Sequence, residues 1–433
     1  MEQMKLEVMG REVIKPSLPS PHDSLQLSIF DLTFPAMYVP VIFFYKAEDA
    51  SPKIISGKLK SSLSETLSRF YPLAGRIEGV SVSCNDEGAV FTEARTDLLL
   101  SDFLRNINID SLDRFSPTTP EDSPTEWPLL SVMVTFFGSG SGVSVSVSVS
   151  HRICDAASLL TFVKDWATTT AKGNSNDTIH FAETTIYPPP DSSLQFPPMD
   201  SNIDNSTSKC ITNRLVFEST KIAELKRKAA SESVRVPTRV EAISALVLKC
   251  AKNASRANLV VPRSILMYQT LDLRLRIPST ILSRDAIGNL HTSLFVKKEA
   301  ESDLDILETV AAFRKTKERV NEMIKENLKS NTLGQYLLGL NGSFGAEVKP
   351  DVDLYIMSSW CRKPFYQVDF GWGSPVWIGS FFDNANMMFV WLIDSKDGDG
   401  VEVWIGLPEQ DMHTFLCNQE LLAYAVLNPP VLI

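Results

Sequence analysis

Hydrophobic and polar residues alternate most regularly over residues 143–150, where Val and Ser follow each other strictly. A period of two predicts a β-strand, and the apolar run 129–137, separated from it by Gly and Ser, predicts its antiparallel partner. From 156 to 170 the apolar spacing becomes helical. The alternation stops at His151, so this residue lies where a predicted strand leads into a predicted helix. The pattern assigns no function to the four Ser, which need hydrogen-bond partners if they face the interior.

The rest of the chain also mixes strands and helices. In the first half, the pattern predicts a strand over 39–46, a helix over 57–70 with Leu at every fourth position, and two short strands around the Asn-Asp-Glu-Gly turn of 80–95. Beyond residue 213, it predicts helices over 221–230, 239–254 and 303–329, a strand over 264–274, and a β-rich tail over 365–407 with a hairpin turning at Asp399-Gly400.

Residues 174–213 separate these two halves. They are rich in Asn, Ser, Asp and Pro and show no periodicity, which predicts a long connection. A chain of 433 residues exceeds one compact core, and its length suggests about two or three domains. The long connection between two halves that mix strands and helices favours two α/β domains.

Composition narrows the class of protein. Hydrophobic residues make up 44% and charged residues 22%, as in soluble globular proteins. A net charge of −10 argues against a nucleic-acid partner. No apolar run is long enough for a membrane helix, and no secretory signal is visible. Six scattered Cys without a C-x-x-C pair predict reduced thiols in a cytoplasmic protein.

His151 and Asp155, four residues apart, form the first candidate site. A His titrates near neutral pH, so it can act as a general base on an alcohol or amine that attacks a carbonyl. The alternatives are a buried core His, a metal site, for which no third ligand lies nearby, and a nucleophile. "GSGSG" does not fit G-x-S-x-G, and Cys154 at a helix start is more typical of a structural thiol. "DSKDGDG" lacks the Glu of a calcium loop.

A second candidate site lies at the start of the predicted helix 239–254. Thr238 and Glu241 form a capping-box pattern, and Arg239 at the first helical position opposes the helix dipole. A bound anion would resolve this conflict, because the backbone N–H groups and the guanidinium would both face it. A solvated Arg is the alternative.

A third stretch, "QVDFGWGSPVW" (367–377), contains Asp369, Gly371, Trp372 and Gly373. Gly residues flanking an aromatic residue indicate positive φ or a close backbone approach. The stretch is either a structural corner or a loop that lines a pocket.

Together, "HRICD" and the distant "DFGWG" resemble the plant BAHD acyltransferases, which move an acyl group from CoA to an alcohol or amine. "FYPLAGRI", "TRVEAISAL", "LDLRLRIP" and "IGNL" also resemble family segments, so the similarity covers nearly the whole chain. The pattern is closest to the alkaloid and terpenoid acetyltransferase branch that includes vinorine synthase. The "YFGNC" of the flavonoid malonyltransferase branch is replaced by "AIGNL" at 286–290.

The resemblance implies two chloramphenicol-acetyltransferase-like domains with mixed β-sheets flanked by helices. The N-terminal domain is expected over 1–180, a crossover loop over 181–212 and the C-terminal domain over 213–433, with part of 370–405 packing on the first domain. A solvent channel is expected between the domains.

The resemblance also implies residue roles. His151 is expected to be the base, and Asp155 to pair with Arg274 and support the His loop. Thr238 and Arg239 are expected to bind CoA. The four DFGWG positions named above are expected to be architectural.

The implied function is O-acetylation of a bulky alkaloid or terpenoid alcohol by acetyl-CoA, in a ternary complex and without an acyl-enzyme. Acyl-CoA is a co-substrate, and no permanently bound cofactor or metal is expected. The protein is expected to be a cytoplasmic monomer without membrane or nucleic-acid partners. Acceptor-facing residues are expected in 28–45, 291–295 and 376–390. The alternatives are a bulkier aromatic or branched acyl donor, and a catalytically silent relative that binds a small molecule or a partner.

Overall fold

The computed structural model describes residues 5–33, 37–47, 51–117, 127–175, 178–181, 186–187, 209–259, 261–381 and 387–433. Most of the predicted crossover, including all of 188–208, lies outside these residues. Residues 210–212, which were predicted to end the crossover, belong instead to the first strand of the second sheet.

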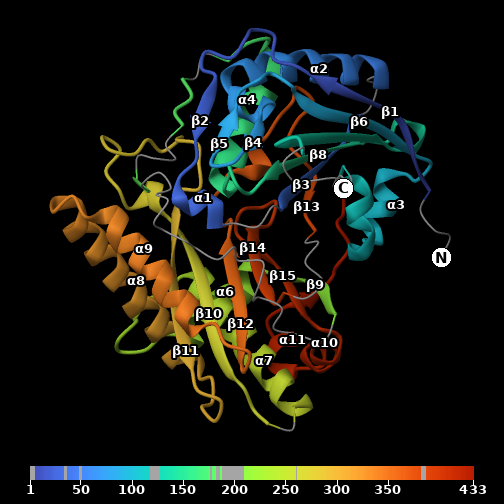
Figure 1. Ribbon diagram of the computed structural model, residues 1–433. Helices are drawn as coiled ribbons and strands as arrows, with labels where there is room; N and C mark the ends of the chain where they lie inside the picture. The colour runs from blue at the N-terminus through green and yellow to red at the C-terminus, as the bar shows by residue number, and fades with distance from the viewer. Residues whose placement is uncertain are drawn as a thin grey trace.

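The upper half of the molecule in Figure 1 is built on a mixed sheet of six strands. Its order is β1 (Leu6–Ile14), β6 (Ala89–Thr96), β7 (Leu130–Phe136), β8 (Val143–Ser150), β3 (Tyr38–Tyr45) and β13 (Trp377–Gly379). β6 and β7 are parallel, and the other neighbours are antiparallel. The predicted β7–β8 pair is therefore confirmed.

Helices α2 (Pro52–Arg69) and α4 (Ala156–Lys172) pack on each other and share one apolar core with this sheet. Leu59, Leu63 and Leu67 of α2 are fully buried, because their spacing of four places them on one helix face. Shorter elements complete the half: α1 (Ile29–Thr33), α3 (Leu100–Arg105) and a small sheet of β2 (Ser24–Gln26), β5 (Ser81–Ser83) and β4 (Arg76–Glu78). The two strands predicted around Asn-Asp-Glu-Gly, β5 and β6, thus lie in different sheets.

The lower half contains a second mixed sheet, of seven strands. Its order is β11 (His291–Lys298), β10 (Ser264–Asp272), β12 (Val352–Ser359), β14 (Phe389–Asp394), β15 (Val401–Pro408), β9 (Cys210–Phe217) and β16 (Val426–Leu427). Its helices are α6 (Ser219–Lys228), α7 (Arg239–Asn258), α8 (Ile306–Lys329), α9 (Leu333–Glu347), α10 (Glu409–Leu416) and α11 (Gln419–Leu422). α7 is packed between α6, α8 and α10 in the second core.

The predicted hairpin over 391–405 is present as β14 and β15, but its turn is longer than predicted. Strand pairing ends at Asp394 and Val401, so residues 395–400 form a loop instead of a turn at Asp399-Gly400. The carboxylate of Asp397 accepts hydrogen bonds from the backbone N–H groups of Asp399 and Gly400, which explains why the loop keeps a defined shape.

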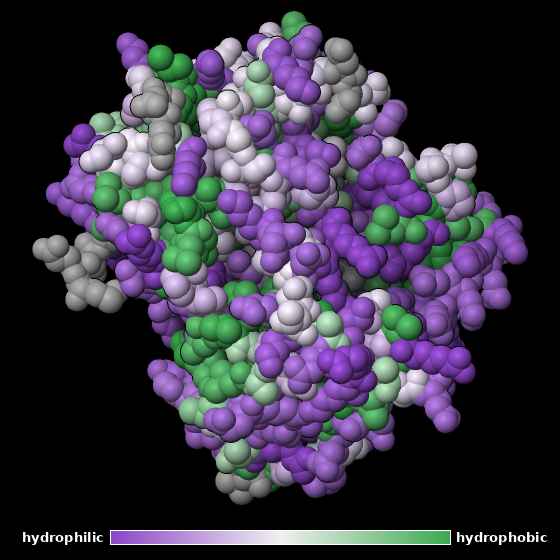
Figure 2. Space-filling model, turned by 180° about the vertical axis from the view of Figure 1, so that it is seen from behind, coloured by the Kyte–Doolittle hydropathy of each residue, from purple (hydrophilic) through white to green (hydrophobic). Residues whose placement is uncertain are grey.

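Two segments from the second half of the chain return to the first half. β13 pairs with β3 at the edge of the first sheet, and the N–H of Val431 donates to the carbonyl oxygen of Leu104 in α3 at 2.8 Å. Figure 1 accordingly shows the C-terminus beside α3. Figure 2 shows the opposite face, on which hydrophilic residues predominate and a hollow lies near the boundary of the two halves. Among the described helices, none combines the length and the apolar character that a membrane span requires.

Candidate active site

His151 lies in the turn directly after β8, next to the strand end Ser150. Its backbone N–H donates to the carbonyl oxygen of Met37, just before β3, at 2.9 Å. Burial lowers the pKa of the imidazole from its usual 6.5. The ring is therefore neutral at neutral pH, which is the form that accepts a proton.

Asn289 determines which nitrogen of this ring carries the proton. Its Oδ1 lies 3.2 Å from Nδ1 of His151. Its Nδ2 donates to the carbonyl oxygen of His151 at 2.6 Å and to Oδ1 of Asp31 at 2.8 Å. Because an amide oxygen only accepts, Nδ1 of the neutral ring donates to it, and the lone pair of the ring is on Nε2.

Asp155 caps the N-terminus of α4 and forms a buried ion pair with Arg274. Its carboxylate lies 2.7 Å from Nη1 and 3.1 Å from Nη2 of Arg274, and it also accepts from the N–H groups of Ser158 at 2.9 Å and Leu290 at 3.1 Å. Burial raises the pKa of Asp155, but the guanidinium and the hydrogen bonds outweigh it and hold that pKa well below its usual range. Asp155 is therefore a permanent anion at neutral pH.

The same ion pair fixes the segment 286–290. Arg274 donates through Nε to the carbonyl oxygen of Ala286 at 2.9 Å and through Nη2 to that of Gly288 at 3.1 Å. The Ser158 hydroxyl receives the N–H of Gly288 at 3.0 Å. These contacts hold the segment against the start of α4 and place Asn289 beside His151. Asp155 thus acts on His151 indirectly, by holding the segment that carries Asn289, which agrees with a supporting role.

His291 is a second imidazole near the first. Its ring centroid lies 6.3 Å from that of His151 and 5.1 Å from that of Phe30, both in T-shaped contact. Burial lowers the pKa of His291 to about 4, so it is neutral. Parts of the predicted acceptor segments 28–45 and 291–295 therefore lie beside His151. Of the segment 376–390, residues 382–386 fall outside the described residues.

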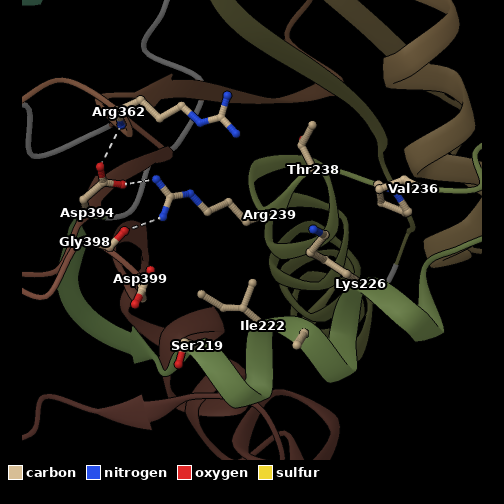
Figure 3. Close-up of a pocket in the computed structure, with 12 residues that line it drawn as sticks. Ser219, Ile222, Lys226, Val236, Thr238, Arg239, Arg362, Asp394, Gly398 and Asp399 are labelled. Carbon is tan, nitrogen blue, oxygen red and sulfur yellow. Dashed lines mark hydrogen bonds and ion pairs between the residues drawn. The ribbon is translucent and has the colours of Figure 1, made fainter.

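The second predicted site forms a surface pocket of about 660 Å³ between α6, the start of α7 and the 395–400 loop (Figure 3). Thr238 caps α7 and completes the predicted capping box with Glu241, which is confirmed. Lys226, Arg239 and Arg362 all line the pocket, so it gathers three cationic side chains. The structure thus adds Lys226 and Arg362 to the residues singled out in the sequence.

The guanidinium of Arg239 is already paired with groups of the protein itself. Figure 3 shows it reaching to Asp394, at 2.6 Å from Oδ1, and to the carbonyl oxygen of Gly398 at 3.0 Å. The carboxylate of Asp394 therefore supplies the negative charge that the helix start was predicted to need. This contact also ties the 395–400 loop to α7.

The DFGWG stretch forms a turn that docks on the first half. Oδ1 of Asp369 accepts from the N–H groups of Gly371 at 2.7 Å and Gly373 at 2.8 Å. Both Gly have positive φ, 101° and 96°, which explains why side chains are excluded there. The ring of Trp372 packs on Tyr45 in T-shaped contact at 5.9 Å.

This turn lies far from His151. A Cβ at Gly371 would be 3.4 Å from Ala171, near the end of α4, whereas Asp155 precedes its first residue. At about 1.5 Å per residue, the two ends are roughly 20 Å apart along the helix. The distance favours an architectural role for the turn.

Sequence reasoning missed two residues of the His151 site, Asn289 and Asp31. Asn289 is 138 positions from His151, so no local spacing connects them. A usable signal did exist for Asp31, because it is a lone acidic residue within the apolar stretch "LSIFDLTF". Among the described residues, no group of three or more His, Cys, Asp or Glu side chains is placed to hold a metal ion.

Comparison with known proteins gives a consistent result. Residues 4–422 match the family described as the Transferase family. The chain is 66% identical to BAHD acyltransferase BIA1 of Arabidopsis thaliana, over 99% of both chains. It is 31% identical to limonoid 21-O-acetyltransferase of Melia azedarach, over 99% of this chain and 100% of the relative. The crystal structure of vinorine synthase superimposes with a TM-score of 0.81 at 29% identity, covering 97% of this chain and 98% of that one.

Proposed function

This chain belongs to the BAHD family of acyl-CoA-dependent acyltransferases, and on that premise we propose that it transfers an acetyl group from acetyl-CoA to a hydroxyl of a bulky, largely hydrophobic plant metabolite. Its two mixed sheets flanked by helices have the chloramphenicol-acetyltransferase-like fold of vinorine synthase. Support for acetyl as the acyl group comes from the relative named as a limonoid 21-O-acetyltransferase. The apolar ring of Phe30 beside the imidazole of His291 supports a hydrophobic acceptor.

The observation that carries this proposal is the contact between Oδ1 of Asn289 and Nδ1 of the buried His151, at 3.2 Å. Its neutral ring donates Nδ1–H to Asn289, so Nε2 is the basic nitrogen. In the mechanism, Nε2 takes the proton of the acceptor hydroxyl as the oxygen attacks the thioester carbonyl carbon. The tetrahedral intermediate then collapses, the C–S bond breaks, and the imidazolium returns its proton to the CoA sulfur. The products are the acetyl ester and free CoA.

The pocket beside α7 is our candidate for the phosphates of CoA. Lys226, Arg239 and Arg362 supply positive charge there, and the N-terminus of α7 adds its dipole. Arg239 is held by Asp394, so in this proposal it shapes the pocket through the 395–400 loop, while Lys226 and Arg362 meet the phosphates. Thr238 keeps the helix start in place.

We further propose a cytoplasmic monomer with no nucleic-acid partner. The net charge of −10 is unfavourable for binding a polyanion, and all six cysteines are free thiols, which suits a reducing compartment.

The reaction is tested with purified protein, acetyl-CoA and a panel of alkaloid and terpenoid alcohols, following free thiol and acetylated product. We expect His151→Ala to lower turnover by about 10²–10⁴-fold. His413→Ala is the matched control, because His413 is an exposed residue of α10, and it should keep wild-type turnover. Comparable turnover in both variants would contradict the proposal. Product from malonyl-CoA or an aromatic acyl-CoA but not from acetyl-CoA would refute acetyl as the donor.

A further inference from the structure

Asp31 is a buried carboxylate beside the active site to which the mechanism above gives no role. It lies in α1 and is 0% exposed. The hydrogen-bond donors that the described residues provide to it are neutral, namely the N–H and hydroxyl of Ser28 and the amide of Asn289. Burial raises the pKa of Asp31 to about 6, although these hydrogen bonds act in the opposite direction. A charged group kept in such surroundings is costly, so it requires an explanation.

The two oxygens of Asp31 have separate tasks. Oδ2 accepts from the N–H of Ser28 at 2.9 Å and from its hydroxyl at 2.6 Å, which caps the short helix α1. Oδ1 accepts from Nδ2 of Asn289 at 2.8 Å. Helix capping therefore accounts for one oxygen only. The other points to the residue that contacts the imidazole.

We propose that Asp31 is a positioning residue that fixes the amide orientation of Asn289 and, through it, the proton on Nδ1 of His151. This inference rests on the proposed function of His151 as the base. The reasoning follows from hydrogen-bonding capacity: a carboxylate oxygen and a carbonyl oxygen only accept. Oδ1 of Asp31 and the carbonyl oxygen of His151 both face the same atom of Asn289, so that atom must be the NH₂ nitrogen. The amide oxygen is then left for Nδ1–H.

Asp31→Asn is the informative variant, because it keeps the shape and reverses one hydrogen bond. Its amide oxygen is needed by the two donors of Ser28, so its NH₂ group faces Asn289. The NH₂ group of Asn289 then either stays toward the carbonyl oxygen of His151 and faces the new NH₂ group, or the amide of Asn289 turns and presents its oxygen to both. The turned orientation relieves the contact with the new NH₂ group and places the nitrogen at Nδ1 of His151. In that orientation the imidazole proton moves to Nε2, and the base is lost. We expect kcat to fall by about 10²–10⁴-fold, with the KM for acetyl-CoA unchanged.

Ser28→Ala is the matched control. It removes the hydroxyl that bonds Oδ2 of Asp31 and leaves the contact from Oδ1 to Asn289. We expect it to lower stability and to leave the proton on Nδ1 of His151. The protonated nitrogen of His151 is read directly from ¹⁵N chemical shifts in histidine-labelled protein, assigned with His151→Ala. We expect Nδ1–H in wild type and Ser28→Ala, and Nε2–H in Asp31→Asn.

The outcomes separate the inference from the proposed function. Nε2–H in wild type, or Nδ1–H together with wild-type kcat in Asp31→Asn, would overturn the inference. Absence of acetyl transfer by wild type would refute the function, while the ¹⁵N shifts still test the role of Asp31.

If Asp31→Asn does not fold, Asp31→Ala and Asn289→Ala are combined, and turnover is measured with an alcohol that wild type acetylates. A residue that acts through Asn289 adds no further loss of kcat in the Asn289→Ala background. An additive loss would overturn the inference.

Discussion

At the scale of single residues, the active site is defined by hydrogen-bonding capacity more than by proximity. His151 has its reactive tautomer because Asn289 presents an oxygen to Nδ1. Asn289 is in place because the Asp155–Arg274 pair holds the backbone on either side of it. In our proposal the HRICD motif thus connects two different tasks, proton transfer at the first residue and support at the last.

Asp155→Asn tests the supporting task. The substitution removes the closest charge opposite Arg274, whose side chain is 2% exposed, and leaves the buried guanidinium with Asp272, at 3.3 Å, as its carboxylate partner. Breaking such a pair costs about 3–5 kcal/mol of unfolding free energy. Glu224→Gln, which breaks the exposed ion pair with Lys221, is the control and should change it by less than about 1 kcal/mol. Both are measured by urea unfolding, and equal stabilities would contradict the role assigned to Asp155.

The pH dependence of activity follows from the state of His151. A general base acts only when it is unprotonated, so kcat/KM falls as pH decreases through its pKa. Burial lowers that pKa from 6.5, so we expect the half-maximal value of kcat/KM below pH 6.5 and a plateau at neutral pH. Asp31, with a pKa of about 6, adds a second loss of the same sign, because its protonation removes the negative charge and weakens the acceptor that faces Asn289. A midpoint above pH 6.5 would show that another group controls the acid limb.

At the scale of elements, strand β8 shows what alternation does and does not predict. Val and Ser lie on opposite faces, yet all eight residues are buried, because β8 is paired on both sides, with β7 and β3. The hydroxyl of Ser148 bonds that of Ser116 at 2.8 Å. Within the described part of the chain, the hydroxyls of Ser144 and Ser146 have no hydrogen-bond partner. A period of two therefore shows which residues share a face of the strand, but it does not show whether either face is exposed to solvent.

Two loops stabilised by an Asp carboxylate allow a paired prediction. Asp369 holds the DFGWG turn, whereas Asp397 holds the loop 395–400 that borders the cationic pocket. We expect Asp369→Ala to lower stability by about 1–3 kcal/mol and to leave the Kd for CoA within about twofold. Asp397→Ala should weaken CoA binding more than it lowers stability. Isothermal titration measures the Kd for CoA, and thermal unfolding measures stability. Weaker CoA binding in Asp369→Ala than in Asp397→Ala would contradict the proposal that the pocket beside the 395–400 loop binds CoA.

At the scale of the whole molecule, the chain does not divide into two independent halves. β13 completes the edge of the first sheet, while β14 and β15, which follow it, lie in the second. The indole N–H of Trp377 in β13 donates to Glu402 in β15 at 3.3 Å. Glu402 in turn pairs with the buried Arg214 of β9. Each sheet therefore depends on chain segments that are fixed by the other.

This interdependence predicts one cooperative unfolding transition. Far-UV circular dichroism, which reports on all helices and strands, and Trp fluorescence should give coincident midpoints in urea. Trp166 in α4 and Trp391 in β14 share one core, but β14 is a strand of the second sheet, so fluorescence reports on elements from both halves. Two separated transitions would show that the halves unfold independently.

The amino-acid sequence alone determined the local features of this protein. Periodicity located α2, α4, α7 and α8 and the β7–β8 pair, because these patterns depend on neighbours within a few residues. The HRICD and DFGWG motifs indicated the family for a similar reason: each is a short string of adjacent residues. The capping box of α7 was likewise readable, since its two residues are three positions apart.

Only the tertiary structure decided which distant groups meet. Asn289 and Asp31 are brought together across 258 positions, and Arg239 meets Asp394 across 155. Neither contact follows from local spacing, because each depends on how two sheets and a returning segment pack. The chemistry of His151 depends on these contacts, since a neighbour's oxygen or nitrogen decides where its proton resides. The sequence thus indicated His151 as the candidate base, and the fold determined which of its nitrogens faces Asn289.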